Sequence, residues 1–130
     1  MSARSLADAV AESAGDAARL YPAVAECLDE FYAHEEWRQA MIDPVPRRVG
    51  KVEDAWLGAV AEHLARRWGL AIPSWVDEPH RFLKEPVFAG GLEDLKAILL
   101  AESPLAFRRR LLFVEAEPLA RARMPREAAP

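Results

Sequence analysis

The chain has 130 residues, and its 17 Lys and Arg side chains against 21 Asp and Glu give a formal net charge of −4. A chain of this length fits one domain and can bury about two-thirds of the surface that its unfolded form exposes. The acidic balance argues against bulk binding of nucleic acid. The single Cys27 excludes an intrachain disulfide, and no window approaches the ~20 apolar residues of a membrane-spanning helix. We therefore expect one domain over residues 1–130, in a reducing cytoplasm and without membrane contact.

The charges are unevenly distributed along the chain. Residues 1–45 carry nine acidic and three basic side chains, whereas residues 46–130 carry fourteen basic and twelve acidic ones. This asymmetry fits either complementarity between the two halves or two faces for different partners, and the sequence leaves both readings open.

Helical spacing dominates the N-terminal part of the chain. Ser5 followed by Asp8 is a capping-box pattern and predicts a first helix that ends near Ala14, before Gly15. Apolar residues at steps of three and four predict a second helix over about 21–34, with Pro22 in its first turn.

Prolines punctuate the next part. A short third helix is expected from Trp37 to Asp43, because Pro44 and Pro46 bar its continuation, and residues 44–50 are predicted to be a linker. The fourth and clearest helix spans about Val52 to Trp68 and ends at Gly69. Its predicted apolar stripe is Val52, Trp56, Ala59, Val60, His63, Leu64 and Arg67.

The C-terminal half begins with a connection over residues 70–91 that is rich in proline and tryptophan and too apolar for a solvated loop, so we expect it to be ordered. A helix is predicted from Leu92 to Glu102. Ser103 is then the expected N-cap of a last helix that begins at Pro104 and continues towards Leu112. Residues 124–130 are predicted to be a frayed tail. The predicted fold class is all-α, a compact bundle of about five to seven helices.

Three successive arginines, Arg108 to Arg110, are the strongest local signal. Successive helical residues turn by 100°, so the three point in different directions and at least one must lie beside apolar neighbours. A partly buried arginine needs an acceptor, and Asp77, Glu78, Glu102 and Glu115 are candidates. The sequence leaves open a structural ion pair, a protein-binding face and a contact to phosphate.

The residue pattern predicts no enzyme chemistry. The three histidines lack the spacing of a metal site, Cys27 has no neighbouring base, and adjacent carboxylates point 100° apart on a helix. We therefore predict no catalytic residues, no metal and no cofactor.

Five segments together resemble a domain that recurs in high-GC actinobacterial proteins. They are Ala61–Leu70, Pro73–Val76, Glu78–Leu83, Glu102–Arg110 and Phe113–Val114. That domain occurs alone or behind an XRE-type helix-turn-helix, and it often neighbours nucleotidyltransferase-like (AbiEii-type) toxins. The resemblance covers about residues 20–123, carries no catalytic residues, and implies the stand-alone form, because residues 1–50 lack a basic recognition helix.

The resulting functional prediction is a non-enzymatic, antitoxin-like protein that neutralises a toxin by occlusion. The predicted partner-binding residues are Trp75, Phe82, Arg108, Arg109 and Arg110, with the acidic N-terminal part as the other docking surface. One alternative is a transcriptional regulator that binds DNA through the basic half, by Arg47, Arg48, Lys51, Arg66, Arg67, Arg121 and Arg123. A further alternative is a small uncharacterised enzyme.

Overall fold

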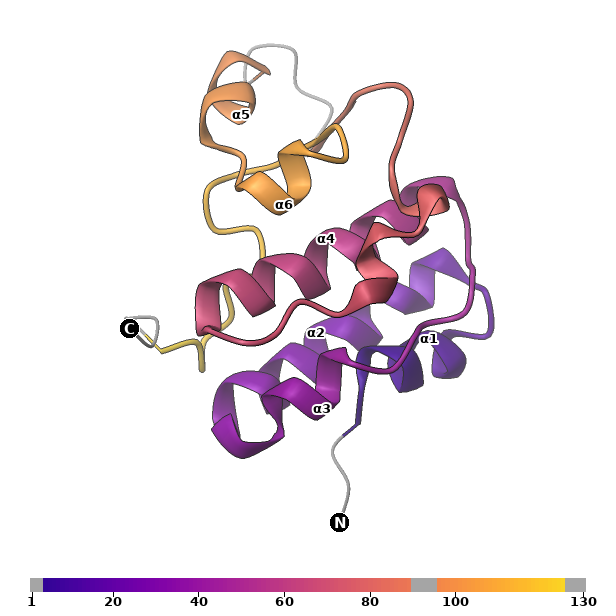
Figure 1. The fold of residues 1–130 in the computed structure, drawn as a ribbon, viewed down its shortest axis with the longest axis vertical. Coiled ribbons are helices and arrows are strands. Elements are labelled where there is room, and N and C mark those ends of the chain that lie inside the picture. Colours follow the sequence, from indigo (N-terminus) through magenta and orange to yellow (C-terminus); the bar gives the residue numbers. More distant parts are fainter. Residues whose placement is uncertain (1–3, 90–95, 126–130) are drawn as a thin grey trace.

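A computed structural model describes residues 4–89 and 96–125, which form a mostly helical fold in stacked layers. The α-helices in these residues are α1 (Leu6–Ser13), α2 (Ala17–Ala33), α3 (Arg38–Ile42), α4 (Lys51–Trp68), α5 (Lys96–Glu102) and α6 (Leu105–Arg108). Figure 1 shows α1 to α3 at one end of the long axis, α4 in the middle, and α5 and α6 at the other end. The predicted all-α class is confirmed.

The central helix α4 is buried around most of its circumference. Eight of its apolar residues have at most 4% of their surface exposed: Ala55, Leu57, Ala59, Val60, Ala61, Leu64, Ala65 and Trp68. The predicted stripe was therefore too narrow, because α4 contacts η2, η3, α6 and α3, and residues outside the stripe are buried as well. Four members of the predicted stripe are only half-buried: Val52, Trp56, His63 and Arg67. Gly69 ends the helix in the left-handed conformation, as predicted, with φ +70°.

The second helix begins earlier than its apolar spacing indicates. Asp16 caps the first turn of α2 by accepting a hydrogen bond from the Ala18 N–H at 2.9 Å. The helix therefore starts at Ala17, and the prediction that Pro22 lies in its first turn is wrong, because Pro22 is inside the helix. The predicted third helix is found as α3, and the 3-10 turn η1 (Glu35–Trp37) precedes it.

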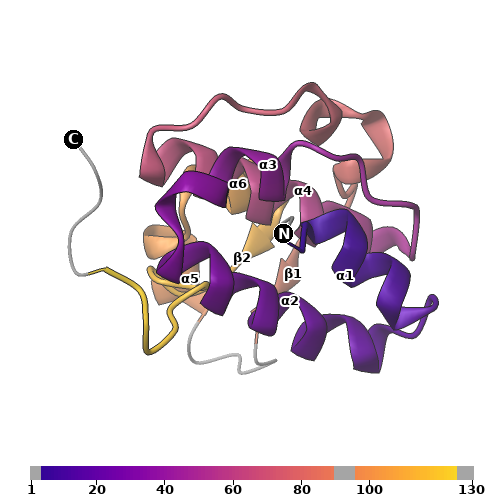
Figure 2. The ribbon, with the colours of Figure 1, turned by 90° about the horizontal axis from the view of Figure 1, so that it is seen from below.

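The connection after α4 is ordered, as predicted. It contains two 3-10 turns, η2 (Ser74–Asp77) and η3 (Pro79–Arg81), which pack against α4, and a short strand β1 (Val87–Phe88). Strand β1 pairs in parallel with β2 (Leu112–Phe113), which the sequence did not predict. Figure 2 shows the two strands behind the N-terminal helices.

The last helix is shorter than predicted. Helix α6 ends at Arg108, and Leu111, with φ +61°, turns the chain into β2 instead of extending the helix towards Leu112. Ser103 is not the N-cap: Pro104 holds that position, and the Ser103 hydroxyl accepts a hydrogen bond from the Val114 N–H at 2.8 Å. The predicted start of the preceding helix, at residues 92–95, lies outside the described residues, as does most of the predicted tail.

Candidate functional site

Glu62 is the centre of a buried ionic cluster on α4. Its side chain is fully buried, and it accepts hydrogen bonds from three arginines. Arg66 contacts it at 2.7 Å, Arg109 at 2.7 and 2.8 Å, and Arg110 at 2.8 Å. Burial alone would raise the pKa of Glu62, but the hydrogen bonds from these three guanidinium groups lower it below its usual value. The carboxylate is therefore held ionised, and it ties α6 to α4.

The arginine triplet is split by this arrangement. Arg110 is fully buried and also donates to the carbonyls of Ala106 and Val76, both at 2.7 Å. Arg109 is 36% exposed and reaches Asp77 at 3.4 Å as well as Glu62. Arg108 is exposed and donates to the carbonyls of Ala101 and Ser103. Of the four acceptors that the sequence offered, Asp77 is the one that forms an ion pair with the triplet.

A second buried arginine lies beside the cluster. Arg81, from η3, donates to the carbonyls of Asp54 and Pro46 at 3.2 and 3.1 Å and pairs with Glu78 at 3.0 Å. Its guanidinium carbon lies 4.5 Å from the centre of the Trp75 ring. These contacts fix the connection after α4 to the start of α4.

Gly58 provides the space in which the two buried arginines pass α4. A Cβ placed on Gly58 would lie 3.0 Å from Nε of Arg110 and 3.2 Å from Cβ of Arg81. Such distances are tighter than an ordinary packing contact, so any side chain here would displace an arginine. Gly58 and Glu62 share one face of α4, one turn apart.

The predicted partner-binding residues differ in their accessibility. Trp75 is 4% exposed and donates from its indole nitrogen to the Ile42 carbonyl at 3.0 Å. Trp75 and Arg110 are thus core residues, and a partner that docks on the folded chain cannot touch them. Phe82 is half-buried beneath Arg109 and Arg110, whose guanidinium carbons lie 5.5 and 4.6 Å from its ring centre. Phe82, Arg108 and Arg109 are the part of the set that reaches the surface.

Sequence reasoning missed Glu62 and Gly58. Neither residue was singled out from the sequence, and Glu62 was not among the acceptors considered for the arginines. The available signal was its position: Glu62 and Gly58 are both flanked by the apolar run of α4, where a charged residue and a glycine each need a packing reason.

The N-terminal layer presents a strongly acidic surface. Within residues 4–45 the exposed acidic residues are Asp8, Glu12, Asp16, Glu26, Glu35, Glu36 and Asp43. Arg19 is the exposed arginine of this range, since Arg4 is half-buried and Arg38 is buried. Arg38 points inwards and donates to the carbonyls of Phe31 and Tyr32. The excess of acidic over basic side chains in this segment therefore lies at the surface.

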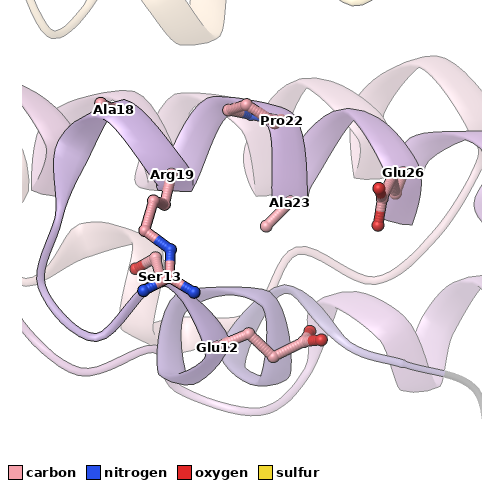
Figure 3. A pocket seen from close by; sticks show the side chains of 7 residues that line it. All are labelled: Glu12, Ser13, Ala18, Arg19, Pro22, Ala23 and Glu26. Atoms are coloured by element: carbon pink, nitrogen blue, oxygen red, sulfur yellow. The ribbon is translucent and has the colours of Figure 1, made fainter.

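A shallow cavity of about 310 Å³ lies in this layer, between α1 and α2. Figure 3 shows Arg19 extending from α2 towards Ser13 and Glu12 on α1, with Glu26 further along α2. The carboxylates of Glu12 and Glu26 form ion pairs with Arg4, at 3.4 and 3.2 Å respectively. Among residues 4–89 and 96–125, no group of three or more histidine, cysteine or acidic side chains is placed to hold a metal ion.

Cys27 is a buried thiol on the inner face of α2. Its sulfur lies 3.4 Å from the Arg4 carbonyl, and burial raises the pKa of the thiol to about 12. The thiolate, which is the reactive form, is therefore disfavoured.

None of the helices in the described part of the chain combines the length and apolar character needed to cross a membrane.

Comparison of the chain with protein-family models, curated proteins and solved structures finds no match. The resemblance to the actinobacterial domain thus remains a prediction from the sequence pattern.

Proposed function

We propose that the chain is a non-enzymatic protein-binding domain that acts as an antitoxin-like partner and neutralises a toxin by covering its active-site groove. The observation that carries this proposal is the charge of the N-terminal layer. Its described residues expose seven acidic residues against one arginine. A surface of this kind complements a basic groove, and complementary charge speeds docking and suppresses wrong partners.

A nucleotidyltransferase-like toxin would offer such a groove, because a site that takes nucleotides or nucleic acid neutralises phosphate with basic side chains. The exposed carboxylates of the N-terminal layer would then occupy the positions that substrate phosphates need. The occlusion requires no chemistry from the antitoxin-like chain. The other predicted contacts, Phe82, Arg108 and Arg109, would meet a second, acidic region of the same partner.

The geometry favours this proposal over a DNA-binding regulator. Four of the seven bases named for that alternative already face a carboxylate within 4 Å: Arg48 with Asp54, Arg66 with Glu62, Arg67 with Glu117, and Arg121 with Asp29. The carboxylate beside each of these arginines offsets part of its attraction for DNA phosphates.

The proposal requires an adjacent gene that encodes a nucleotidyltransferase-like protein. Co-expression of the chain with that protein should restore growth of cells that the protein alone arrests. The double variant Glu35→Lys/Glu36→Lys, which reverses two exposed charges of the N-terminal layer, should lose most of the rescue. The matched control is Glu85→Lys/Glu115→Lys, which reverses two exposed charges outside the layer and should rescue like the wild type. Failure of the wild-type chain to rescue growth would overturn the proposal.

A further inference from the structure

Arg66, from α4, and Arg109, which follows α6, come together at the surface over the buried Glu62 carboxylate. Nε of Arg66 and Nη1 of Arg109 lie 2.7 and 2.8 Å from the same oxygen atom, Oε2 of Glu62. These two nitrogen atoms are therefore at most about 5.5 Å apart, the sum of the two contacts. Both arginine side chains reach solvent, with exposed fractions of 43% and 36%. One small ligand can therefore contact both guanidinium groups.

The cluster around Glu62 carries more positive than negative charge. Three guanidinium groups, of Arg66, Arg109 and Arg110, contact the single carboxylate of Glu62. A second carboxylate, of Asp77, lies 3.4 Å from Nη2 of Arg109 and is 64% exposed. That distance is longer than a strong charge-assisted hydrogen bond, so Asp77 is held weakly. The three positive charges exceed the two negative ones even with Asp77 in place.

This charge balance separates the cluster from the other arginines that the DNA-binding alternative names. Arg48, Arg67 and Arg121 each face a carboxylate of their own, so each of those pairs is neutral. The Glu62 carboxylate is instead shared among three guanidinium groups. An anion that approaches the cluster therefore meets an excess of positive charge.

The exposed arginines also have hydrogen-bond donors to offer. Arg66 donates to Glu62 through Nε, and its two terminal nitrogen atoms make no hydrogen bond to any of the described residues. Nη2 of Arg109 has only the long contact to Asp77 within the same residues. The bonds to Glu62 hold both side chains in place, so little of their conformational freedom is left to lose when a ligand binds.

We propose that Arg66 and Arg109 form a binding site for a doubly charged phosphate group, as the free ion or as a monoester. The phosphate oxygens accept hydrogen bonds from the terminal nitrogen atoms of Arg66 and from Nη2 of Arg109, and they displace Asp77 from its contact. A double charge is favoured because, without Asp77, three guanidinium groups face the Glu62 carboxylate alone. The inference does not rest on the proposed toxin partner, although Arg109 is also one of the predicted partner contacts.

Titration of the ¹⁵N-labelled full chain with inorganic phosphate, at constant ionic strength and pH 8, tests the site. The Nε–Hε signals of Arg66 and Arg109 should shift together and give one dissociation constant, in the millimolar range or tighter. Those of Arg108 should stay in place, because its guanidinium group donates to the Ala101 and Ser103 carbonyls. No shift of the Arg66 and Arg109 signals, or an equal shift of the Arg108 signal, would overturn the proposal.

Two esters define the ligand. Methyl phosphate carries two charges at this pH, and its affinity relative to inorganic phosphate shows whether the site prefers the monoester or the free ion. Dimethyl phosphate carries one charge and should bind at least about fivefold more weakly than methyl phosphate. Tighter binding of dimethyl phosphate would contradict a site for a doubly charged group and would favour the phosphodiesters of a nucleic acid.

Three variants test the roles of the residues. Asp77→Asn removes the competing carboxylate and should tighten phosphate binding at least about twofold. Arg66→Gln removes one guanidinium group and should weaken it at least about fivefold. Arg108→Gln is the matched control and should bind like the wild type. The Asp77 variant leaves every bond to Glu62 intact, so it decides the question even if Arg66→Gln does not fold, and weaker binding by Asp77→Asn would contradict the site.

Discussion

Gly58 decides how closely the buried arginines approach α4. At an ordinary helix position, Gly→Ala increases helix stability by about 1 kcal/mol. Here the added methyl group would meet Arg110 at 3.0 Å and two atoms of Arg81 at 3.2 Å, and both arginines are fully buried and cannot move into solvent. We therefore expect Gly58→Ala to destabilise the chain by about 1–3 kcal/mol, the usual cost of overpacking. Urea unfolding followed by tryptophan fluorescence measures this, and a gain in stability would contradict the described packing.

Glu62 makes the stability of the fold depend on pH. Its folded-state pKa is lowered from the usual value of 4.5, so the ionised carboxylate stabilises the fold above that value. The contribution is lost as the pH falls through the folded-state pKa. Glu62→Gln should cost about 3–5 kcal/mol near neutral pH, because buried guanidinium charge is left without its carboxylate.

The comparison of pH profiles separates this effect from a general loss of packing. Between about pH 5 and pH 2 the melting temperature of the wild type should fall more steeply than that of Glu62→Gln. Asp29→Asn is the matched control, since the pKa of Asp29 is also lowered, by its hydrogen bond from Arg121, but at the surface. Parallel profiles for the wild type and Glu62→Gln would exclude Glu62 as the titrating group.

The residues also show what the sequence could predict of the site. Helix geometry predicted correctly that the three arginines diverge, and that at least one lies among apolar neighbours. It could not identify the acceptor, because Glu62 is 48 positions from Arg110 and the pairing depends on how α6 crosses α4. Trp75 was assigned to a binding surface for the same reason, since nothing local indicates that the Ile42 carbonyl accepts its N–H.

At the scale of elements, α2 carries a built-in defect. Pro22 lies within the helix and has no backbone N–H, so it cannot donate a hydrogen bond to the carbonyl of Ala18. Its side chain is exposed and is therefore not part of the core. Pro22→Ala should raise the unfolding free energy by about 1–2 kcal/mol, after subtraction of the entropy that proline removes from the unfolded chain. Thermal unfolding measures the change, and Arg19→Ala, an exposed substitution in the first turn, is the control. A lower melting temperature for Pro22→Ala would show that the proline is needed by α2.

Elements with strong local signals were predicted well, and those fixed by distant contacts were not. The bounds of α4 follow from its apolar run and from Gly69, and both are in the sequence. The start of α2 was missed because Pro22 was taken as a first-turn residue, while the cap at Asp16 was overlooked. The β1–β2 pair has only two residues in each strand, too short for an alternating pattern, and its register depends on the turn at Leu111.

At the scale of the molecule, the acidic surface and the arginine cluster occupy different parts of the fold. Helices α1 to α3 form one end in Figure 1, and α6 lies on the other side of α4. The uneven charge seen along the sequence is thus uneven in space as well, although Arg121 and Asp29 form an ion pair between the two halves. This separation is the physical basis for our proposal that a partner docks on the N-terminal layer, whereas the Glu62 cluster holds the fold together.

The rate of association with the nucleotidyltransferase-like protein that the proposal requires tests the proposed docking surface most directly. If the N-terminal layer steers the encounter, the rate measured by stopped-flow should fall at least about tenfold between low and high salt. Glu35→Lys/Glu36→Lys should be slow already at low salt, whereas Glu85→Lys/Glu115→Lys should behave like the wild type. A rate that is insensitive to salt and equal for both double variants would contradict the claim that this acidic layer is the docking surface.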